Sequence, residues 1–335
     1  MNRFKKIHRL LTLVSFLACI VFSGPVAAEI PQDHQTVPDL LADQGAGQSH
    51  WLFLGDSITY AGHYVDYLET WYLLHEARPP EMIDLGVSSE TIANTSEPDH
   101  PFQRPWLLNQ LDRVLNRVKP NLVFACYGMN DGIYHPFSED RFRAFQLGVN
   151  TLVEKARAIG ASIVLLTPPP YAGKTRPRPI PVDGETYSYK RPFADYNGVL
   201  ETYAEWLLSL DEHDDIRVID IRPVLETFME ESYPAEPIHP SVFGHQLIAE
   251  ALLQGLSKTP GNALIEIRIN SRDSDPHWAS VMRLVSQQRE IYDRALLNDI
   301  GHGNPYIMRS NTLTLLEAEE QVKPVNAAIE ELHHE

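Results

Sequence analysis

Cysteine is the residue type that this chain has least of. Only two occur among 335 residues, Cys19 and Cys126. If the N-terminal segment is removed, as argued below, one cysteine remains and the mature chain cannot form an internal disulfide. Neither cysteine belongs to a Cys/His cluster with zinc-ligand spacing. Folding therefore has to rest on a packed core, which a chain of this length can form as one or two domains.

Basic residues are also scarce, with 28 Lys and Arg against 45 Asp and Glu, for a formal net charge of −17. Such an acidic surface repels phosphate backbones and anionic lipid, so we expect no nucleic-acid partner. Four histidines, His63, His75, His100 and His135, are scattered along the chain. Their spacing predicts no metal site.

Long hydrophobic runs are limited to Leu10–Phe22, a mainly apolar stretch of 13 residues. Basic residues precede this stretch, and Val26-Ala27-Ala28 follows it with small residues for cleavage. A transmembrane helix needs about 20 residues, so residues 1–28 are predicted to be a secretory signal peptide. Cleavage would move the formal charge to −21, because residues 1–28 hold four basic and no acidic residues.

The predicted location is secreted or periplasmic, with no stable membrane span after cleavage. Two alternatives stay open: an uncleaved anchor or buried helix, and a lipoprotein acylated at Cys19. Residues 29–48 are polar and punctuated by Pro and Gly, and we expect them to form a leader into the fold.

Strand-like and helix-like patterns alternate through residues 49–260. Apolar runs predict five strands, at Trp51–Leu54, Glu81–Leu85, Leu122–Tyr127, Ile163–Leu166 and Ile216–Ile221. Helical spacing predicts five helices between and after them, at His63–Leu74, Pro105–Val118, Ser138–Ala158, Phe193–Leu210 and Val242–Leu256. Such alternation favours right-handed crossovers and a parallel sheet covered on both faces. A Pro-rich loop, Pro168–Pro192, is long enough to be a functional lid or rim.

Residues 261–335 have a different pattern, and we expect them to form a mainly helical extension packed on the main domain. Ile265, Ile267 and Ile269 alternate like a short edge strand. Asp275-Pro276 is typical of an N-cap followed by proline at the first helical position. A shorter acidic helical piece ends at His333-His334.

One short motif follows the first predicted strand directly: Gly55-Asp56-Ser57-Ile58-Thr59. A serine on a tight strand-to-helix turn has an exposed hydroxyl, and backbone N–H groups at the helix start can face an oxyanion. The alternative is that Asp56 or Ser57 only caps the helix.

Three further blocks fall at or near the same edge of the predicted sheet. Asp84-Leu85-Gly86 follows the second strand, and Gly128-Met129-Asn130-Asp131 follows the third. Glu236-Pro237-Ile238-His239-Pro240 precedes the last helix of the main domain. Open α/β sheets bind ligands at the carboxyl ends of their strands, so we expect these blocks to converge on one site.

The order of these blocks resembles the SGNH (GDSL-type) hydrolases over residues 51–256. That resemblance implies a three-layer α/β/α sandwich with a flavodoxin-like parallel sheet, and an activity that hydrolyses esters without a metal or cofactor. It also implies Ser57 as nucleophile, His239 as its general base, and an oxyanion hole from the Ser57 and Gly86 N–H groups and the Asn130 amide. Acyl transfer requires the same parts: a serine, a base and convergent donors.

Two positions depart from the family pattern. Glu236 stands where the family usually has aspartate, and it is one methylene longer. Either Glu236 orients His239, or a backbone carbonyl does so and Glu236 is a solvated loop residue. The second departure is Ser89, where many relatives have glycine.

Together these features predict an exported serine esterase that acts through an acyl-Ser57 intermediate on a small-molecule or polysaccharide ester, with an O-acetyl carbohydrate as the favoured substrate. Lipase, thioesterase or acyltransferase activity at the same site, or an inactive carbohydrate-binding protein, are the alternatives. Four loop tyrosines can line a sugar-binding rim or serve local packing, namely Tyr134, Tyr171, Tyr187 and Tyr189. Arg176 and Arg178 can meet an anionic sugar, although solvated charge is the favoured interpretation. The sequence leaves the oligomeric state open.

Overall fold

The protein is described by a computed structural model covering residues 49–182, 185–210, 216–256, 275–307 and 313–334. All of these residues fall in a single compact unit. The predicted signal peptide, the leader and the edge strand at residues 265–269 lie outside the described residues. Within the described ranges, no helix is both long and apolar enough to span a membrane.

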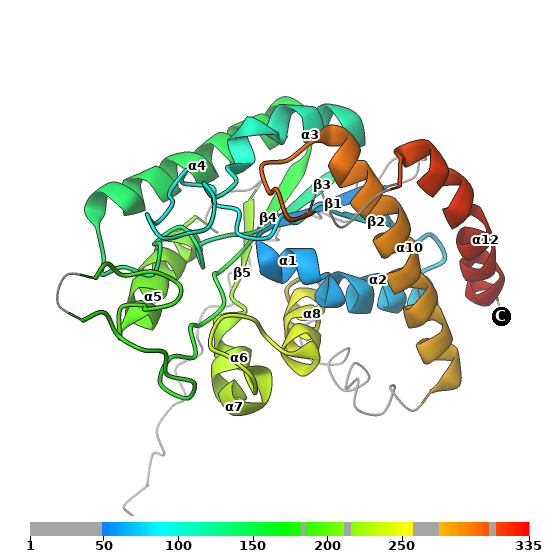
Figure 1. The fold of residues 1–335 in the computed structure, drawn as a ribbon. Helices are drawn as coiled ribbons and strands as arrows, with labels where there is room; N and C mark the ends of the chain where they lie inside the picture. Colours follow the sequence, from blue (N-terminus) through cyan, green and yellow to red (C-terminus); the bar gives the residue numbers. More distant parts are fainter. Residues whose placement is uncertain (1–48, 183–184, 211–215, 257–274, 308–312, 335) are drawn as a thin grey trace, which may run out of the picture. The chain divides into compact units, whose positions relative to one another are not determined.

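A five-stranded parallel sheet lies at the centre of this unit (Figure 1). Its strands are β1 (His50–Gly55), β2 (Glu81–Asp84), β3 (Leu122–Cys126), β4 (Ser162–Leu166) and β5 (Ile216–Ile219). They pair in the order β2-β1-β3-β4-β5, which is the flavodoxin-like order. The predicted fold class is therefore confirmed.

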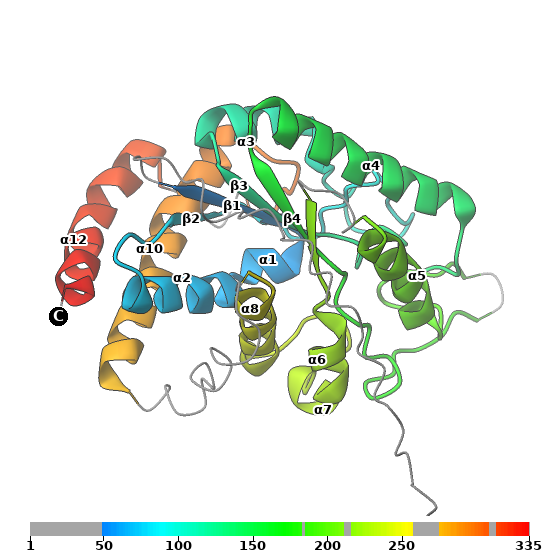
Figure 2. The same cartoon turned by 180° about the vertical axis from the view of Figure 1, so that it is seen from behind.

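Helices cover both faces of the sheet (Figures 1 and 2). On one side lie α3 (Leu111–Val118), α4 (Glu139–Ala158) and α5 (Tyr196–Leu208), and on the other α1 (Ser57–Ala61), α2 (His63–His75), α6 (Arg222–Thr227), α7 (Met229–Ser232) and α8 (Val242–Leu256). Alternate side chains of β1 supply the two cores. Leu52 and Leu54 pack with residues of α3, α4 and α5, whereas Trp51 and Phe53 pack with α2 and α8.

The strand and helix patterns predicted these elements closely, with two differences. The predicted helix at residues 105–118 begins as a separate 3₁₀ turn, η1 (Leu107–Asn109), before α3. The short helices α6 and α7 were not predicted. At four to six residues they hold too few turns to show an apolar period.

The described residues of the C-terminal part include two helices, α10 (Pro276–Ile300) and α12 (Leu315–His333). Asp275 caps α10 by accepting from the His277 N–H, as the Asp-Pro pair predicted. Leu296, Leu297 and Ile300 of α10 enter the core shared with α3, α4 and α5. This burial attaches the extension to the main fold through hydrophobic contact.

A buried ion pair also joins α10 to α2. Arg289 donates from Nε and Nη2 to the Asp66 carboxylate, at 2.7 and 3.0 Å. Space for the guanidinium exists because residue 62 is glycine: a Cβ there would lie 2.2 Å from the Arg289 Cζ. Gly62 also ends α1 at φ +75, a backbone conformation that side chains with a Cβ rarely adopt.

Candidate active site

Ser57 is the first residue of α1, directly beyond the carboxyl end of β1. Asp56 caps the helix, with Oδ1 accepting from the Ile58 N–H at 2.9 Å. The capping interpretation and the nucleophile interpretation of this motif are thus compatible, because Asp56 forms the cap and leaves the Ser57 hydroxyl free to face outward. Ser57 is half-buried and lines a cavity.

His239 meets Ser57 from the loop that precedes α8. The Ser57 hydroxyl and His239 Nε2 are 2.8 Å apart, across 182 positions of sequence. On its other side, His239 Nδ1 lies 2.6 Å from Glu236 Oε1. A backbone bond from Ser241 to Ser232 at 2.7 Å closes this loop and holds the histidine at the strand ends.

Glu236 is fixed by several donors. Its carboxylate accepts from the His239 N–H at 2.5 Å and from the Ile238 N–H at 3.1 Å. Arg178 of the Pro-rich loop donates to Oε2 at 2.6 Å. Partial burial opposes the charged form, but the hydrogen bonds and charge of His239 outweigh it and hold the pKa of Glu236 below its ordinary 4.5. The sequence left open whether Glu236 or a backbone carbonyl orients His239. In the structure it is the Glu236 carboxylate that lies within hydrogen-bond distance of His239 Nδ1.

Asn130 follows β3 and lies beside Ser57 in the cavity wall. Its amide nitrogen donates to Asp56 Oδ2 at 3.3 Å and to the Glu90 carbonyl at 3.2 Å. Tyr134 donates to Asn130 Oδ1 at 3.0 Å, which sets the orientation of the amide. Both hydrogen bonds from the amide nitrogen are long and therefore weak. The amide can exchange them for a hydrogen bond to an oxyanion.

Gly86 is not brought to this cavity, which corrects the prediction that its N–H belongs to the oxyanion hole. That N–H donates to Asp84 Oδ1 at 2.9 Å in a buried turn. A Cβ at Gly86 would meet the Tyr60 nitrogen at 2.4 Å, so glycine is required there for close packing against α1.

Ser89 lies where Gly86 was expected. It lines the cavity with Ser57 and Asn130 and has φ 68, in the left-handed region. No acceptor for its N–H occurs among the described residues. The departure from glycine at Ser89 was the signal in the sequence, since glycine is the residue that adopts this backbone conformation most readily.

The cavity has a volume of about 530 Å³, within the range of small-molecule sites. Its lining combines polar groups with aromatic rings, and it has few aliphatic side chains. The lining residues are Ser57, Ser88, Ser89, His100, Pro101, Phe102, Arg104, Asn130, Tyr134, Tyr189, Ile238, His239, Asn304, Tyr306 and Ile307. Arg104 is buried and donates twice to Glu97, at 2.6 Å each, so its charge is neutralised locally.

Buried carboxyl groups lie behind the cavity. Burial raises the pKa of Asp56 to about 6, against the opposing effects of the Ile58 N–H, His239 and Arg104. Burial likewise raises the pKa of Asp131 to about 7, although three backbone N–H groups donate to it. Glu90 is fully buried and accepts from Tyr127 and Gln110.

The aromatic rim considered from the sequence is formed only in part. Tyr134 and Tyr171 are buried, and Tyr187 packs on His135 and Phe193. Tyr134 and Tyr189 both line the cavity. In the part of the chain that the structure describes, no group of three or more His, Cys, Asp or Glu side chains could hold a metal ion.

A hydroxyl, an imidazole and a carboxylate in this order can move a proton from serine to histidine and stabilise the imidazolium. Fold and side-chain arrangement together define a serine hydrolase type of site at the carboxyl end of a parallel sheet. The chain matches the GDSL-like lipase/acylhydrolase family over residues 53–247, which is more than half its length. It belongs to this family and is a hydrolase acting on ester bonds.

The solved structures to which the chain is similar include Axe2, an acetylxylan esterase from Geobacillus stearothermophilus, at 20% identity and a TM-score of 0.47, over 64% of this chain and 96% of that one. A putative lipolytic protein of the G-D-S-L family from Desulfitobacterium hafniense shares 21% identity at a TM-score of 0.43, over 62% of this chain and 99% of that one. A gut microbial diltiazem-metabolizing enzyme shares 16% sequence identity at a TM-score of 0.45, over 62% of this chain and 47% of that one. A comparison with curated proteins returned no match.

Proposed function

We propose that this hydrolase is an exported serine esterase that cleaves its substrate through an acyl-Ser57 intermediate. One observation carries the mechanism: the continuous chain from the Ser57 hydroxyl through His239 to Glu236, with links of 2.8 and 2.6 Å. Such a chain activates a hydroxyl that is otherwise a weak nucleophile.

In the proposed reaction the Ser57 oxygen attacks the ester carbonyl while His239 Nε2 accepts the hydroxyl proton. Glu236 holds the Nδ1–H and stabilises the imidazolium. The N–H groups of Ser57 and Ser89 and the Asn130 amide donate to the oxyanion. His239 then protonates the leaving alkoxide, and a water molecule deprotonated by the same imidazole hydrolyses the acyl-serine.

The substrate we favour is an O-acetyl ester of a carbohydrate. Polar and aromatic side chains dominate the cavity lining, and among the described residues that line it only Ile238 and Ile307 are branched aliphatic. A long acyl chain needs an extended apolar surface to compensate for leaving lipid or micelle. This lining therefore suits a short acyl group on a polar alcohol better than a lipid.

Turnover of 4-nitrophenyl acetate, butyrate and octanoate by the purified protein tests the esterase and its acyl preference. We expect the acetate to be the best substrate and Ser57→Ala to abolish turnover of all three. Acetylated Ser57 should be detectable by mass spectrometry after rapid acid quench. If the wild-type protein hydrolyses none of these esters yet binds oligosaccharides, the inactive carbohydrate-binding alternative is correct.

The same test separates the related activities. A preference for the octanoate would favour a lipase, and faster turnover of acetyl-CoA than of oxygen esters would favour a thioesterase. Product that carries the acetyl group on an added alcohol, rather than free acetate, would indicate an acyltransferase.

Export is proposed from the three-part pattern of residues 1–28. N-terminal sequencing of the protein recovered outside the cytoplasm should find a start near Glu29. A mature chain beginning at an acylated Cys19 would show that the lipoprotein alternative is correct.

A further inference from the structure

One wall of the cavity comes from a part of the chain outside the family match. The match ends at residue 247, yet Asn304, Tyr306 and Ile307 line the cavity together with Ser57 and His239. These residues belong to the segment that follows α10, drawn in orange in Figure 1. The C-terminal extension therefore contributes directly to the space where substrate binds.

Asn304 fixes this segment against the loop that follows β2. Its Nδ2 donates to the Ser88 carbonyl at 2.7 Å, and its Oδ1 accepts from the N–H groups of Tyr306 and Ile307 at 2.9 and 3.3 Å. Asn304 and Ile307 are buried, and the bonds of Asn304 to Ser88 and Tyr306 are part-buried. The position of Tyr306 at the cavity mouth is thus built into the fold.

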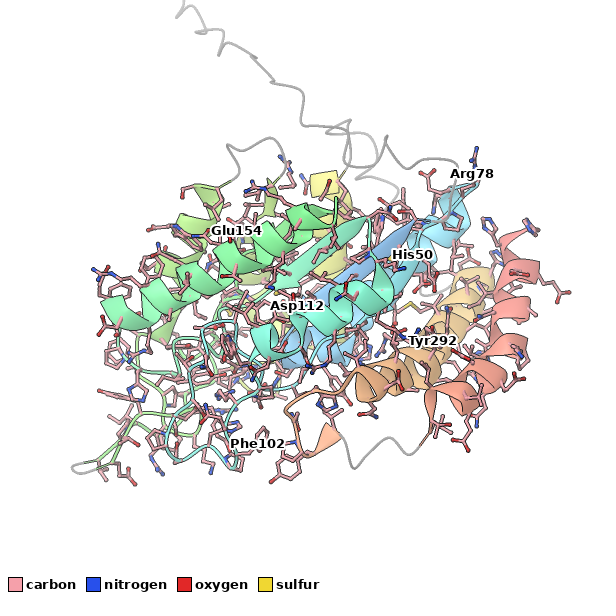
Figure 3. All side chains as sticks on the ribbon, turned by 90° about the horizontal axis from the view of Figure 1, so that it is seen from above. His50, Arg78, Phe102, Asp112, Glu154 and Tyr292 are labelled. Carbon is pink, nitrogen blue, oxygen red and sulfur yellow. The ribbon has the colours of Figure 1, made fainter. Side chains whose placement is uncertain are left out.

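Tyr306 stands at the end of a row of rings that comes from three separate segments. Its centroid lies 5.3 Å from that of Phe102, at an interplanar angle of 64°. Phe102 contacts His100 at 4.6 Å, and His100 contacts Tyr189 at 5.6 Å. His50 is the first residue of β1, and in Figure 3 Phe102 lies at the other end of the sheet. Ser57 follows β1 at that same end.

Tyr306 is 57% exposed in spite of its size. Its ring contacts that of Phe102, and both rings line the cavity beside polar side chains. A pyranose ring has a C–H face that packs on an aromatic ring and hydroxyl groups at its edge that reach polar neighbours. The cavity also presents no free cation from Arg104, since Glu97 neutralises it, which suits a neutral sugar.

We propose that Phe102 and Tyr306 form a subsite for a neutral pyranose ring of the esterified carbohydrate, with Asn304 as the positioning residue that holds Tyr306 in place. This assignment rests on the proposed esterase function and adds its specificity-determining residues. It makes the C-terminal extension a part of substrate recognition.

The test compares acetylated xylotetraose with ethyl acetate, whose alcohol carries no ring. For Tyr306→Ala we expect the ratio of kcat/KM between the two substrates to fall about tenfold, mainly through KM for the oligosaccharide. Tyr306→Phe keeps the ring and should keep the ratio near that of the wild-type protein. Phe137→Ala removes an exposed ring on a loop outside the cavity and is the matched control.

Equal losses on both substrates, or no loss on either, would overturn the subsite. A loss of the same size on 4-nitrophenyl acetate would assign it to aromatic alcohols and overturn the sugar assignment. Calorimetric binding of unacetylated xylotetraose to Ser57→Ala, weakened about tenfold in Ser57→Ala/Tyr306→Ala, supports the subsite without any turnover. If the protein binds xylotetraose in this way but hydrolyses no ester, the proposed esterase function is wrong and the sugar subsite still stands.

Discussion

The acid at position 236 illustrates how a longer side chain is accommodated beside the histidine of the proposed catalytic chain. Glutamate has one more rotatable bond than aspartate, so more conformational freedom must be lost to hold its carboxylate still. In this protein the carboxylate receives the imidazole, two backbone N–H groups and the Arg178 guanidinium. Four donors around one carboxylate leave little room for another rotamer.

Replacing Glu236 by glutamine should lower kcat/KM by about 10⁴-fold, the loss seen when serine-protease triads receive an amide in place of the acid. The amide nitrogen can donate to Nδ1 and so favours the wrong imidazole tautomer. Because the pKa of Glu236 lies below 4.5, its carboxylate stays ionised as pH rises from 5 to 9. The loss should therefore persist across that range in a pH profile of kcat/KM.

His239→Ala serves as the control for Glu236→Gln, since it removes the base itself and should be at least as severe. Glu236→Asp keeps the carboxylate charge on a side chain one methylene shorter. It therefore shows whether activity depends on the length of the side chain or only on its charge. A decrease of less than about tenfold in Glu236→Gln, or 1.4 kcal/mol, would reduce the site to a Ser57–His239 dyad.

Arg178 is expected to act on catalysis mainly through Glu236, and it also donates to the carbonyl oxygen of Tyr189, a residue that lines the cavity. Its pair with the carboxylate is partly exposed, and such pairs contribute about 0.2–1 kcal/mol. We expect Arg178→Gln to lower kcat by up to about fivefold with little change in KM. Arg176 in the same loop bonds to the Pro234 carbonyl, so Arg176→Gln is the matched control for steady-state kinetics. Loss in both variants would point to the loop as a whole.

The meeting of side chains was predictable from the sequence where a motif places the side chain itself. Ser57, His239 and Glu236 meet in the structure because each block stands at the end of a strand or before a helix. The backbone donor was not predictable in the same way. Gly86 and Ser89 both follow β2, and only the path of the turn decides which N–H faces the cavity.

At the scale of elements, apolar periodicity identified every strand and every helix of three turns or more in the main domain. Periodicity could not show where α10 attaches, because the attachment depends on contacts more than 200 residues apart. Asp293 on α10 accepts from the Asp84 N–H at the end of β2, and Arg289 pairs with Asp66. In the sequence alone, nothing distinguishes these charged residues from ordinary surface residues.

Breaking the Arg289–Asp66 pair should be costly because both side chains are buried. Arg289→Ala leaves an uncompensated carboxylate, and we expect the free energy of unfolding in urea to fall by about 3–5 kcal/mol. Arg283→Ala removes an exposed arginine of the same helix and should change it by less than about 0.5 kcal/mol.

Substituting both partners tests whether the cost comes from the unpaired charge. In Arg289→Met/Asp66→Leu neither charge of the pair stays buried, so most of the lost stability should return. If the double variant is as unstable as Arg289→Ala, then the ion pair itself, rather than the burden of an orphaned carboxylate, stabilises the docking of α10.

At the scale of the whole molecule, the acidic balance of the chain extends into its interior. Asp56, Glu90 and Asp131 lie behind the active site, and Glu69 and Asp293 lie between α2, β2 and α10. Burial raises the pKa of each of these groups. The folded state therefore binds protons that the unfolded chain has already lost at the same pH.

These carboxyl groups make stability decrease as pH rises from 5 to 7, whereas His245 and His302, whose pKa burial lowers to about 3 and about 4, act in the opposite direction below about pH 6.5. For Asp131, the folded pKa of about 7 exceeds the ordinary 3.8, so its contribution is complete below pH 3.8 and is lost as pH rises through about 7. Asp131→Asn cannot titrate, and the slope of the free energy of unfolding against pH between 5 and 7 should become less negative by up to about 1.4 kcal/mol per pH unit. Thr95→Val is the control, because it removes the hydrogen bond from the Thr95 hydroxyl to the Asp131 carbonyl without removing a titratable group. That variant should lower stability at every pH and keep the wild-type slope, and an unchanged slope in Asp131→Asn would mean that Asp131 is already ionised in the folded protein at pH 5.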